Sequence, residues 1–432
     1  MAGFPVGSAR AWLSDTDVVP ERMPLSNAKR VVVKVGTAVV SNSDGTLALS
    51  RLGALVEQLR GLKDQGRQVI LVSSGAVGLG RLRLGLAKDV VANPANVIDR
   101  QACAAAGQGI LMSTYDMLFQ RLGLTCAQVL ITQGDFLSRQ RYSYLTDTLD
   151  RLTSLGVIPI INENDVVTGC HELDTQRVFS DNDKLSALLA AGSDADGLAL
   201  LTDVEAVFTK PPDQEGAERI KVYNSLTAVE IGEKSSMGRG GMASKIGAAR
   251  VAALGGVHTV VASGYDLDNI AKVFAGADVG TLFPASARPN KRQRWLTFAT
   301  VSEGKIRVKA AAKDRLISSS AAQALLANDL VNIYGDFPDR AVVTVEDQDG
   351  VEFARGMVQM SADNMRKEVQ VRRDERTRRG EWSGRAKWRR EKGNGREKEG
   401  EHGGQGEGGR KEERRQVVAG EKGGRRRGKD QG

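Results

Sequence analysis

The stretch Val31-Val32-Val33-Lys34-Val35-Gly36-Thr37 decides the fold of this 432-residue chain. Its β-branched run is typical of a strand buried on both faces. Gly36 lets a ligand approach the backbone, and Lys34 adds a cation beside exposed N–H groups. A glycine cluster in residues 238–244 precedes Lys245 in the same way. Proteins bind phosphate with such elements, so we expect Lys34 and Lys245 to contact one phosphoryl group. The alternative is that each element is an ordinary turn.

Short apolar runs alternate with helical patterns on the C-terminal side of this strand. Further strands are expected over 68–72, 125–131, 157–161, 197–201 and 257–262, and helices over 48–65, 98–122, 142–155, 184–191 and 242–254. Continuous apolar strands separated by helices indicate the α/β class, with a mostly parallel sheet that is covered on both faces. The catalytic domain is expected to span residues 29–284, after an N-terminal extension over 1–28.

The amino-acid composition of the chain changes after this domain. Prolines and charged residues indicate a linker over 285–294, and short strand-like pieces broken by glycines predict a small, mainly β domain over 295–367. Residues 368–432 are rich in Gly, Arg, Lys and Glu and have few apolar side chains, which predicts disorder. A genuine tail and a gene-model artefact both remain open for this segment.

The basic character of the chain is confined to its end. The formal net charge of the whole chain is +8. Residues 371–432 hold 21 Lys and Arg against 12 Asp and Glu, a net charge of +9, so the rest of the chain carries a net charge of −1. The net charge therefore does not predict that the folded part binds nucleic acid.

Cysteine usage and hydropathy indicate where the protein resides. No apolar run approaches the roughly 20 residues that a membrane helix needs, and no secretory signal is recognisable at the start. The three cysteines form no CxxC pair, and the adjacent Cys170 and His171 do not make a zinc site. We expect a reduced intracellular compartment, cytoplasmic, with a plastid left open.

Polar clusters follow several predicted strands. Residues 73–75 (Ser-Ser-Gly) and 162–165 (Asn-Glu-Asn-Asp) stand where ligands collect in an open α/β sheet. Asp165 offers a partner for an ammonium group, and Ser74 with nearby N–H groups offers one for a carboxylate. Ordinary turns and helix caps are the alternative.

Two more clusters fall in similar places. Residues 180–183 (Ser-Asp-Asn-Asp) precede an apolar helix, and a helix cap accounts for only one or two of these residues. Asn182 is therefore assigned to substrate and Asp183 to orienting the lysines. Thr202 and Asp203 follow another predicted strand, where they are assigned to a nucleotide. The alternative is a plain junction between strand and loop.

Several enzyme classes are excluded by missing motifs. The chain has no GxxxxGK[ST], no GxGxxG after a strand, no kinase HRD or DFG signature and no HExxH. A phosphotransferase without a P-loop is the main enzymatic option left.

Taken together, these motifs carry a family resemblance. Residues 32–37, 73–80, 162–165, 181–183, 201–203 and 240–245 resemble, in order, the glutamate 5-kinases of the amino acid kinase family. The sequences of these motifs are similar to those in the kinase half of plant pyrroline-5-carboxylate synthase. Residues 295–367 look like the PUA domain that follows the kinase in many bacterial members.

The resemblance implies an αβα sandwich and transfer of the ATP γ-phosphoryl group to the side-chain carboxylate of glutamate. The product would be γ-glutamyl phosphate, in the first step of proline biosynthesis. Mg²⁺ would be held by the ATP phosphates. A homo-oligomer and feedback inhibition by proline are further implications.

Residue roles also follow from the resemblance. Lys34 and Lys245 would neutralise the transferring group, Asp183 would hold both lysines, and Ser74, Asp165 and Asn182 would bind glutamate. The nucleotide would contact Lys34, Thr202, Asp203, Arg239, Gly240, Gly241, Met242, Ala243, Ser244 and Lys245. Arg239 departs from the Thr of many bacterial members.

Other hypotheses compete with this one. Within the fold, kinases of N-acetylglutamate, aspartate or UMP are the nearest rivals, and Asp165 favours a free amino acid over an acylated one. The rival from another class is an RNA-binding protein that uses residues 295–367 and the basic tail.

Overall fold

The computed structural model describes residues 18–93, 96–167, 181–224, 241–290, 302–318 and 324–372. The chain divides into two compact units, Met1–Thr300 and Val301–Gly432. No helix within these described ranges is long and apolar enough to cross a membrane.

The first unit is built on a seven-stranded sheet with the order β3-β4-β2-β1-β5-β6-β7. The strands are β1 (Arg30–Val35), β2 (Gln68–Ser73), β3 (Cys126–Ile131), β4 (Ile158–Glu163), β5 (Gly197–Thr202), β6 (His258–Ser263) and β7 (Thr281–Phe283). All neighbouring pairs are parallel except β6 and β7. The prediction of a mostly parallel sheet is confirmed, with β1 in its middle.

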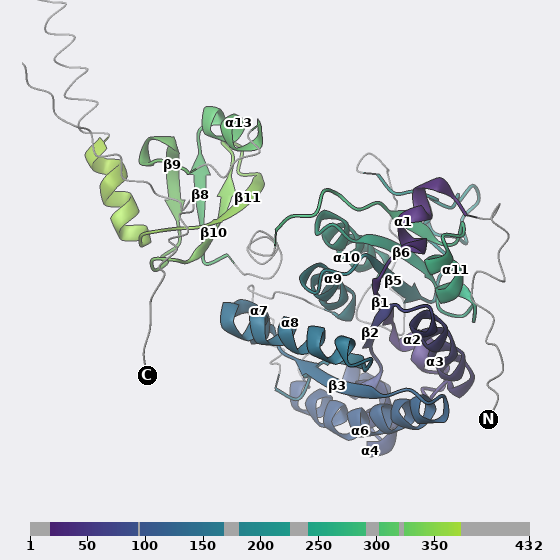
Figure 1. Ribbon diagram of the computed structural model, residues 1–432. Coiled ribbons are helices and arrows are strands. Elements are labelled where there is room, and N and C mark those ends of the chain that lie inside the picture. The colour runs from purple at the N-terminus through teal and green to yellow at the C-terminus, as the bar shows by residue number, and fades with distance from the viewer. Residues whose placement is uncertain are drawn as a thin grey trace, which may run out of the picture. The chain divides into compact units, whose positions relative to one another are not determined.

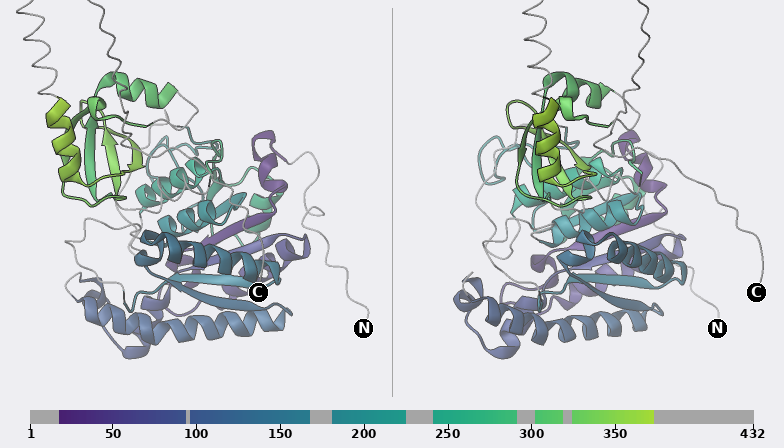
Figure 2. Two further views of the ribbon diagram at one scale, coloured as in Figure 1. Left: turned by 60° about the vertical axis from the view of Figure 1, so that its left-hand side comes forward. Right: turned by 90° about the vertical axis from the view of Figure 1, so that its left-hand side faces the viewer.

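Helices cover both faces of this sheet (Figure 1 and Figure 2). On one face lie α8 (Arg139–Ser154), α9 (Asn182–Gly192) and α10 (Met242–Leu254), and on the other lie α3 (Leu49–Asp64), α6 (Val97–Arg121) and α11 (Asn269–Ala275). The sandwich follows from strands that are apolar on both sides and must bury both faces. The predicted αβα arrangement is confirmed.

The alternation of side chains along β1 positions the lysine. Val31, Val33 and Val35 belong to the apolar core that includes the leucines of α3. Because successive side chains of a strand point to opposite faces, Lys34 points away from α3 and toward α9.

Residues before β1 are part of the first unit. A 3-10 turn (η3, Pro20–Arg22) and a short helix α1 (Met23–Ser26) bury Arg22 and Leu25 completely or nearly so. The guanidinium of Arg22 donates to the carbonyls of Val279, Lys221 and Gly280. The domain boundary expected at residue 29 is therefore too late: residues 18–28 belong to the fold.

The expected linker also begins inside this unit. The backbone N–H of Ser286 donates to Ala253 O at 2.8 Å, and Arg288 donates to the carbonyls of Ala195 and Gly256. Residues 285–290 thus lie along the first unit, and residues 291–294 of the expected linker lie outside the described residues.

Two glycines let the helix that follows β2 pack tightly. Helix α4 (Ala76–Leu84) meets α6 at Gly80 and Gly107. A Cβ at Gly107 would lie 1.9 Å from Ala76 O, and one at Gly80 would lie 1.7 Å from Cys103 O. Only hydrogen atoms fit at these two positions, and the contact fixes the start of α4 beside the sheet edge.

The second unit contains a four-stranded sheet with the order β11-β10-β8-β9. Its elements are β8 (Gly304–Val308), α13 (Ala310–Ser318), η5 (Ala327–Asp329), β9 (Leu330–Tyr334), β10 (Val342–Glu346) and β11 (Glu352–Met357). Their apolar sides enclose a core that includes Phe337, Val343 and Met365. The small, mainly β domain is confirmed, and a helix over 362–372 continues past the boundary expected at 367. Most of the predicted disordered tail, 373–432, lies outside the described residues.

Candidate active site

Two lysines from distant parts of the chain meet on one carboxylate. Lys34 Nζ lies 2.5 Å from Asp183 Oδ1, and Lys245 Nζ lies 3.4 Å from Asp183 Oδ2. Lys34 is the next-to-last residue of the central strand, Asp183 stands in the first turn of α9, and Lys245 stands in the first turn of α10. The structure therefore brings together the three residues that the sequence assigned to catalysis.

The start of α9 shows which acid is structural. Asp181 is the N-cap of this helix: its side chain accepts from Lys184 N at 3.0 Å and from the hydroxyl of Ser244. Asp183, the second residue of the helix, is not needed as a cap. Its carboxylate is free to hold the lysines, and the Ser244–Asp181 hydrogen bond ties the start of α10 to the start of α9.

Burial and charge act against each other at Asp183. Its side chain is only 3% exposed, and burial alone would raise the pKa of the carboxyl group. The charges of Lys34 and Lys245 outweigh burial, so the pKa lies below its ordinary value and Asp183 stays ionised. The trio holds two cations and one anion, which leaves a net positive charge for a ligand.

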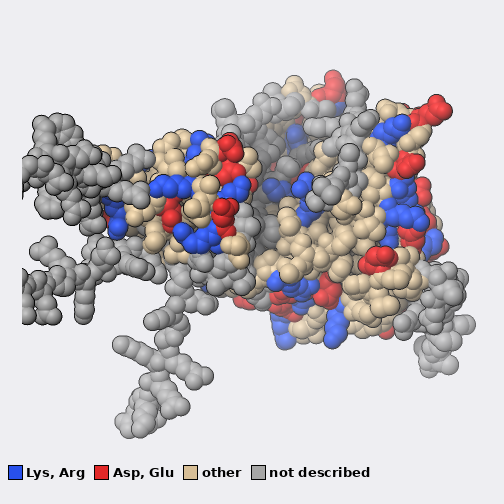
Figure 3. Space-filling model, turned by 90° about the horizontal axis from the view of Figure 1, so that it is seen from above, with Lys and Arg blue, Asp and Glu red and all other residues tan. Residues whose placement is uncertain are grey.

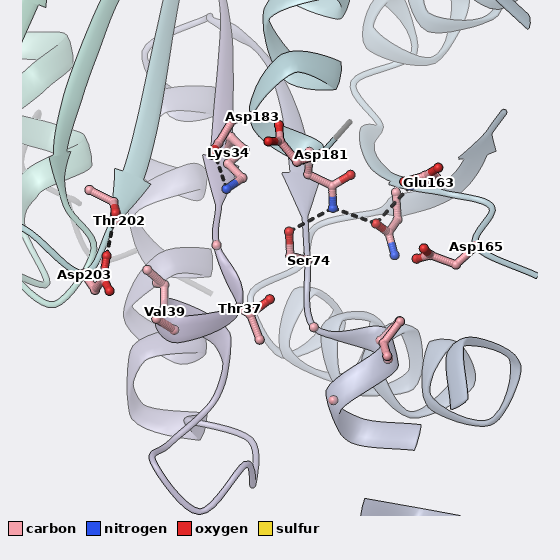
Figure 4. Close-up of a pocket in the computed structure, with 18 of the residues that line it drawn as sticks. Lys34, Thr37, Val39, Ser74, Glu163, Asp165, Asp181, Asp183, Thr202 and Asp203 are labelled. Carbon is pink, nitrogen blue, oxygen red and sulfur yellow. Dashed lines mark hydrogen bonds and ion pairs between the residues drawn. The ribbon is translucent and has the colours of Figure 1, made fainter. Parts of the chain in front are cut away.

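A chain of amide hydrogen bonds lies beside this trio (Figure 4). Asn182 Nδ2 donates to Ser73 O at 3.2 Å, Ser74 Oγ at 2.8 Å and Asn162 Oδ1 at 2.9 Å. The ends of β2, β4 and α9 are thereby held together at the carboxyl edge of the sheet. The carbonyl oxygen of Asn182 is buried and has no hydrogen-bond partner among the described residues.

Gly75 makes the turn from β2 into α4. Its φ of 114° is a left-handed conformation that residues with a side chain rarely adopt. The turn leaves Ser74 at the end of the strand and places residues 75–78 along the cavity described below.

Asp165 lies at the far side of the site from Thr202 and Asp203 (Figure 4). Desolvation raises the pKa of its carboxyl group to about 6, although the nearby charge of Arg100 acts in the opposite direction. A carboxylate that is costly to ionise in this surrounding gains from a cationic ligand group.

All these groups line one cavity of about 430 Å³. Of the predicted site residues, it is lined by Lys34, Ser74, Asp165, Asn182, Asp183, Thr202, Asp203 and Lys245. Thr202 Oγ1 donates to Asp203 Oδ1 at 2.8 Å. Residues Gly241–Ser244 lead into α10 beside Lys245 but do not line the cavity, and Arg239 and Gly240 lie outside the described residues.

Sequence reasoning missed three cations of this cavity. Arg81 comes from α4, Lys88 from α5 (Lys88–Ala92) and Arg100 from α6. Lys88 and Arg100 stand on helices with no glycine-rich or polar-cluster signature, and Arg81 follows the 73–80 motif by one residue, so no local pattern assigned these three to the cavity.

The described residues contain no group of three or more His, Cys, Asp or Glu that could hold a metal ion. Two carboxylates of the cavity already have partners: Asp183 forms ion pairs with the two lysines, and Asp181 caps the start of α9. Such a site suits a metal that arrives on a ligand's phosphates, because Mg²⁺ often takes most of its ligands from phosphate and water. Cys170 and His171 lie outside the described residues.

The fold and the paired lysines thus define a phosphotransferase of the α/β class that has no P-loop. The model of the amino acid kinase family matches residues 29–263, and the PUA domain model matches residues 304–373. A glutamate 5-kinase of Acaryochloris marina is 40% identical over 357 residues, 81% of this chain and 93% of that protein. One from Moorella thermoacetica is 41% identical over 79% of this chain and 89% of its own length.

A delta-1-pyrroline-5-carboxylate synthase of Solanum lycopersicum is 43% identical over 69% of this chain, but only 42% of that longer protein is covered. The solved isopentenyl phosphate kinase of T. acidophilum shares 16% identity over 59% of this chain and 99% of its own, with a TM-score of 0.41, too weak a likeness to support an argument. The chain belongs to the amino acid kinase family, among relatives named glutamate 5-kinase.

Proposed function

We propose that the protein transfers the γ-phosphoryl group of ATP to the γ-carboxylate of L-glutamate and releases γ-glutamyl phosphate, the first step of proline biosynthesis. The observation that carries the proposal is the shared carboxylate of Asp183, which holds Lys34 and Lys245 in one cavity. The relatives named glutamate 5-kinase support the choice of acceptor.

The chemistry of the acceptor fits the residues of the cavity. A carboxylate is already ionised at neutral pH, so the reaction needs no general base. Phosphoryl transfer then depends on in-line positioning and on stabilising the charge that spreads over the transferring group. Lys34 and Lys245 supply that charge, and Asp183 keeps both in position without neutralising them.

The amide cluster and Asp165 are assigned to the amino acid. The unpaired carbonyl oxygen of Asn182 can accept from the substrate, and Ser74 presents its hydroxyl at the end of β2. Asp165 supplies a negative charge for the α-ammonium group, which N-acetylglutamate lacks. A free amino acid is therefore favoured over an acylated one.

The nucleotide is assigned to the opposite side of Lys34, where Thr202 and Asp203 line the cavity (Figure 4). The start of α10 adds backbone N–H groups and the positive end of its dipole for phosphate oxygens. When bound on the ATP phosphates, Mg²⁺ neutralises part of their charge. Arg239 and Gly240 keep their predicted contact with the nucleotide as part of this proposal.

An acceptor screen tests the proposed function. The purified chain is supplied with Mg-ATP and, in turn, glutamate, N-acetylglutamate, aspartate and UMP, and ADP release is measured. Hydroxylamine, which traps an acyl phosphate as a hydroxamate, identifies the product. We expect turnover and hydroxamate with glutamate alone; activity on N-acetylglutamate without activity on glutamate would overturn the choice of substrate.

Nucleic-acid binding by the second unit stays a prediction, supported by the PUA match. Several described cations of this unit have acidic partners: Lys305 and Arg307 pair with Glu346, and Lys313 pairs with Asp347. Figure 3 shows basic and acidic side chains interleaved on the visible face of this unit, on the left of the view. Deleting residues 373–432, which leaves the helix over 362–372 intact, tests the tail separately, since kinase turnover should stay and RNA retention should fall.

The homo-oligomer, inhibition by proline and residence in the cytoplasm also stay proposals that follow from the family resemblance. Size-exclusion chromatography with light scattering, and turnover measured at increasing proline concentration, test the first two directly.

A further inference from the structure

The three unassigned cations of the cavity are not equivalent. The guanidinium of Arg81 already has a hydrogen-bond partner, because its Nη1 donates to Leu86 O at 3.1 Å in the turn that ends α4. Lys88 is exposed on the short helix α5, where a flexible ammonium group is well hydrated. Arg100 differs from both: it is half-buried, and its side chain has no hydrogen bond or ion pair with any other described residue.

A partly buried guanidinium that makes no hydrogen bond is costly. Taking a charge out of water is unfavourable unless an opposite charge or hydrogen bonds compensate. The planar fork of arginine binds a carboxylate through two parallel hydrogen bonds, a geometry that lysine cannot match. Arg100 is therefore suited to an anionic group that arrives with a ligand.

The position of Arg100 indicates which anionic group this is. It lies close enough to Asp165 for its charge to act on that carboxyl group, and both residues line the same cavity. Asp165 lies on the side of the cavity away from Thr202 and Asp203 (Figure 4). A cation and an anion that act on one another in the same cavity, with the anion away from Thr202 and Asp203, match the two charges that an amino acid carries on its α-carbon.

We propose that Arg100 binds the α-carboxylate of the substrate while Asp165 binds its α-ammonium group. The inference rests on the proposed function and specifies how the acceptor is oriented: the zwitterionic end is held by Arg100 and Asp165, and the γ-carboxylate points toward Lys34 and Lys245. Arg100 is then a specificity residue that selects α-amino acids with a free carboxylate.

The test compares two acceptors that differ only at this group. Glutamate and its 1-amide, isoglutamine, share the α-ammonium and the γ-carboxylate, but the amide has no α-carboxylate charge. The probes are used with the full chain and Mg-ATP, and kcat/KM is measured for each. Losing a charge-assisted hydrogen bond lowers affinity roughly 10- to 100-fold, so kcat/KM of the wild type should be higher for glutamate than for isoglutamine by about that factor.

Variants of Arg100 then locate the source of the preference. In Arg100→Met, kcat/KM should fall for glutamate by about the same factor and change little for isoglutamine, so the preference disappears. Arg100→Lys keeps the charge without the fork and should retain an intermediate preference. Lys88→Met is the matched control from the same cavity and should keep the full preference.

The outcomes separate this inference from the proposed function. A wild type that phosphorylates neither acceptor contradicts the proposed function. A wild type that prefers glutamate, with Arg100→Met keeping that preference, overturns only the role of Arg100 and leaves the carboxylate to Ser74 and backbone N–H groups. If Arg100→Met does not fold, the decision rests on Arg100→Lys, and an undiminished preference there overturns the proposal.

Discussion

The ammonium group of Lys34 lies 2.5 Å from Oδ1 of Asp183, and both side chains are more than nine-tenths buried. The second oxygen of the same carboxylate faces Lys245. One negative charge therefore fixes two positive charges and balances only one of them. The remaining charge is held in place before any ligand binds, which is the condition for electrostatic stabilisation without reorganisation.

Lys245→Ala should lower kcat far more than it raises the KM for glutamate. The charge of Lys245 is needed most when negative charge spreads over the transferring group, so its loss should cost about 10²- to 10³-fold in kcat. Steady-state kinetics with glutamate and Mg-ATP measure both parameters. Lys29→Ala, at an exposed lysine before β1, is the control and should leave both unchanged. A normal kcat with a raised KM would contradict the assigned role.

The KM for glutamate should depend on pH through Asp165. The pKa of its carboxyl group is raised to about 6, so the group is ionised above pH 6 and protonated below it. Protonation removes the partner of the substrate ammonium, and KM should rise about tenfold between pH 7 and pH 5. The kcat at saturating glutamate should change much less over this range.

Asp165→Asn provides the control for this pH dependence. The variant should show a high KM at pH 7 and no further rise toward pH 5. Because the folded-state pKa lies above the unfolded value, ionised Asp165 opposes folding above pH 6, and this effect fades as pH falls toward 3.8. Asp165→Asn should therefore melt no lower than the wild type at pH 8; a clearly lower Tm would show that the carboxylate is structural.

Much of the fold could be predicted because the signals are local. Apolar runs such as residues 157–161 are continuous, and glycines mark most helix ends. The polar clusters at strand ends were also predictable, since parallel strands place their carboxyl ends on one edge of the sheet.

Other features had no local signal. Arg22 is an ordinary arginine in the sequence, and only the folded chain brings the carbonyls of Val279 and Gly280 to it. Arg100 lies on a long helix, and its place in the cavity depends on how α6 packs. The sequence assigned Asp183 to the lysines, but only the folded helix start shows that Asp181 is the cap and that it also accepts from Ser244.

Gly107→Ala should destabilise the first unit and disturb the substrate site. Its Cβ would lie 1.9 Å from Ala76 O and 2.5 Å from Gly80 N, so α4 and α6 must separate. We expect a loss of about 1–3 kcal/mol in unfolding free energy and a raised KM for glutamate, because Gly75 and the first turn of α4 line the cavity. Urea unfolding and steady-state kinetics measure the two effects.

Gly109→Ala is the matched control for Gly107→Ala on the same helix. A Cβ at Gly109 would meet nothing within 4 Å, and alanine has the better helix propensity. This variant should be more stable by about 0.5–1 kcal/mol and keep the wild-type KM. Equal effects of the two substitutions would show that the contact between α4 and α6 does not control the site.

Arg22→Met should destabilise the first unit without changing its chemistry. The guanidinium is buried, and its removal leaves the carbonyls of Lys221 and Gly280 without this donor and weakens the charge balance at Asp278. Breaking such a buried network typically costs about 3–5 kcal/mol, measurable as a lower urea midpoint, while kcat/KM at low temperature should stay unchanged. Arg151→Met, at an exposed arginine near the end of α8, should change stability by no more than about 0.5 kcal/mol. If Arg22→Met were as stable as Arg151→Met, residues 18–28 would be an appendage and not part of the folded unit.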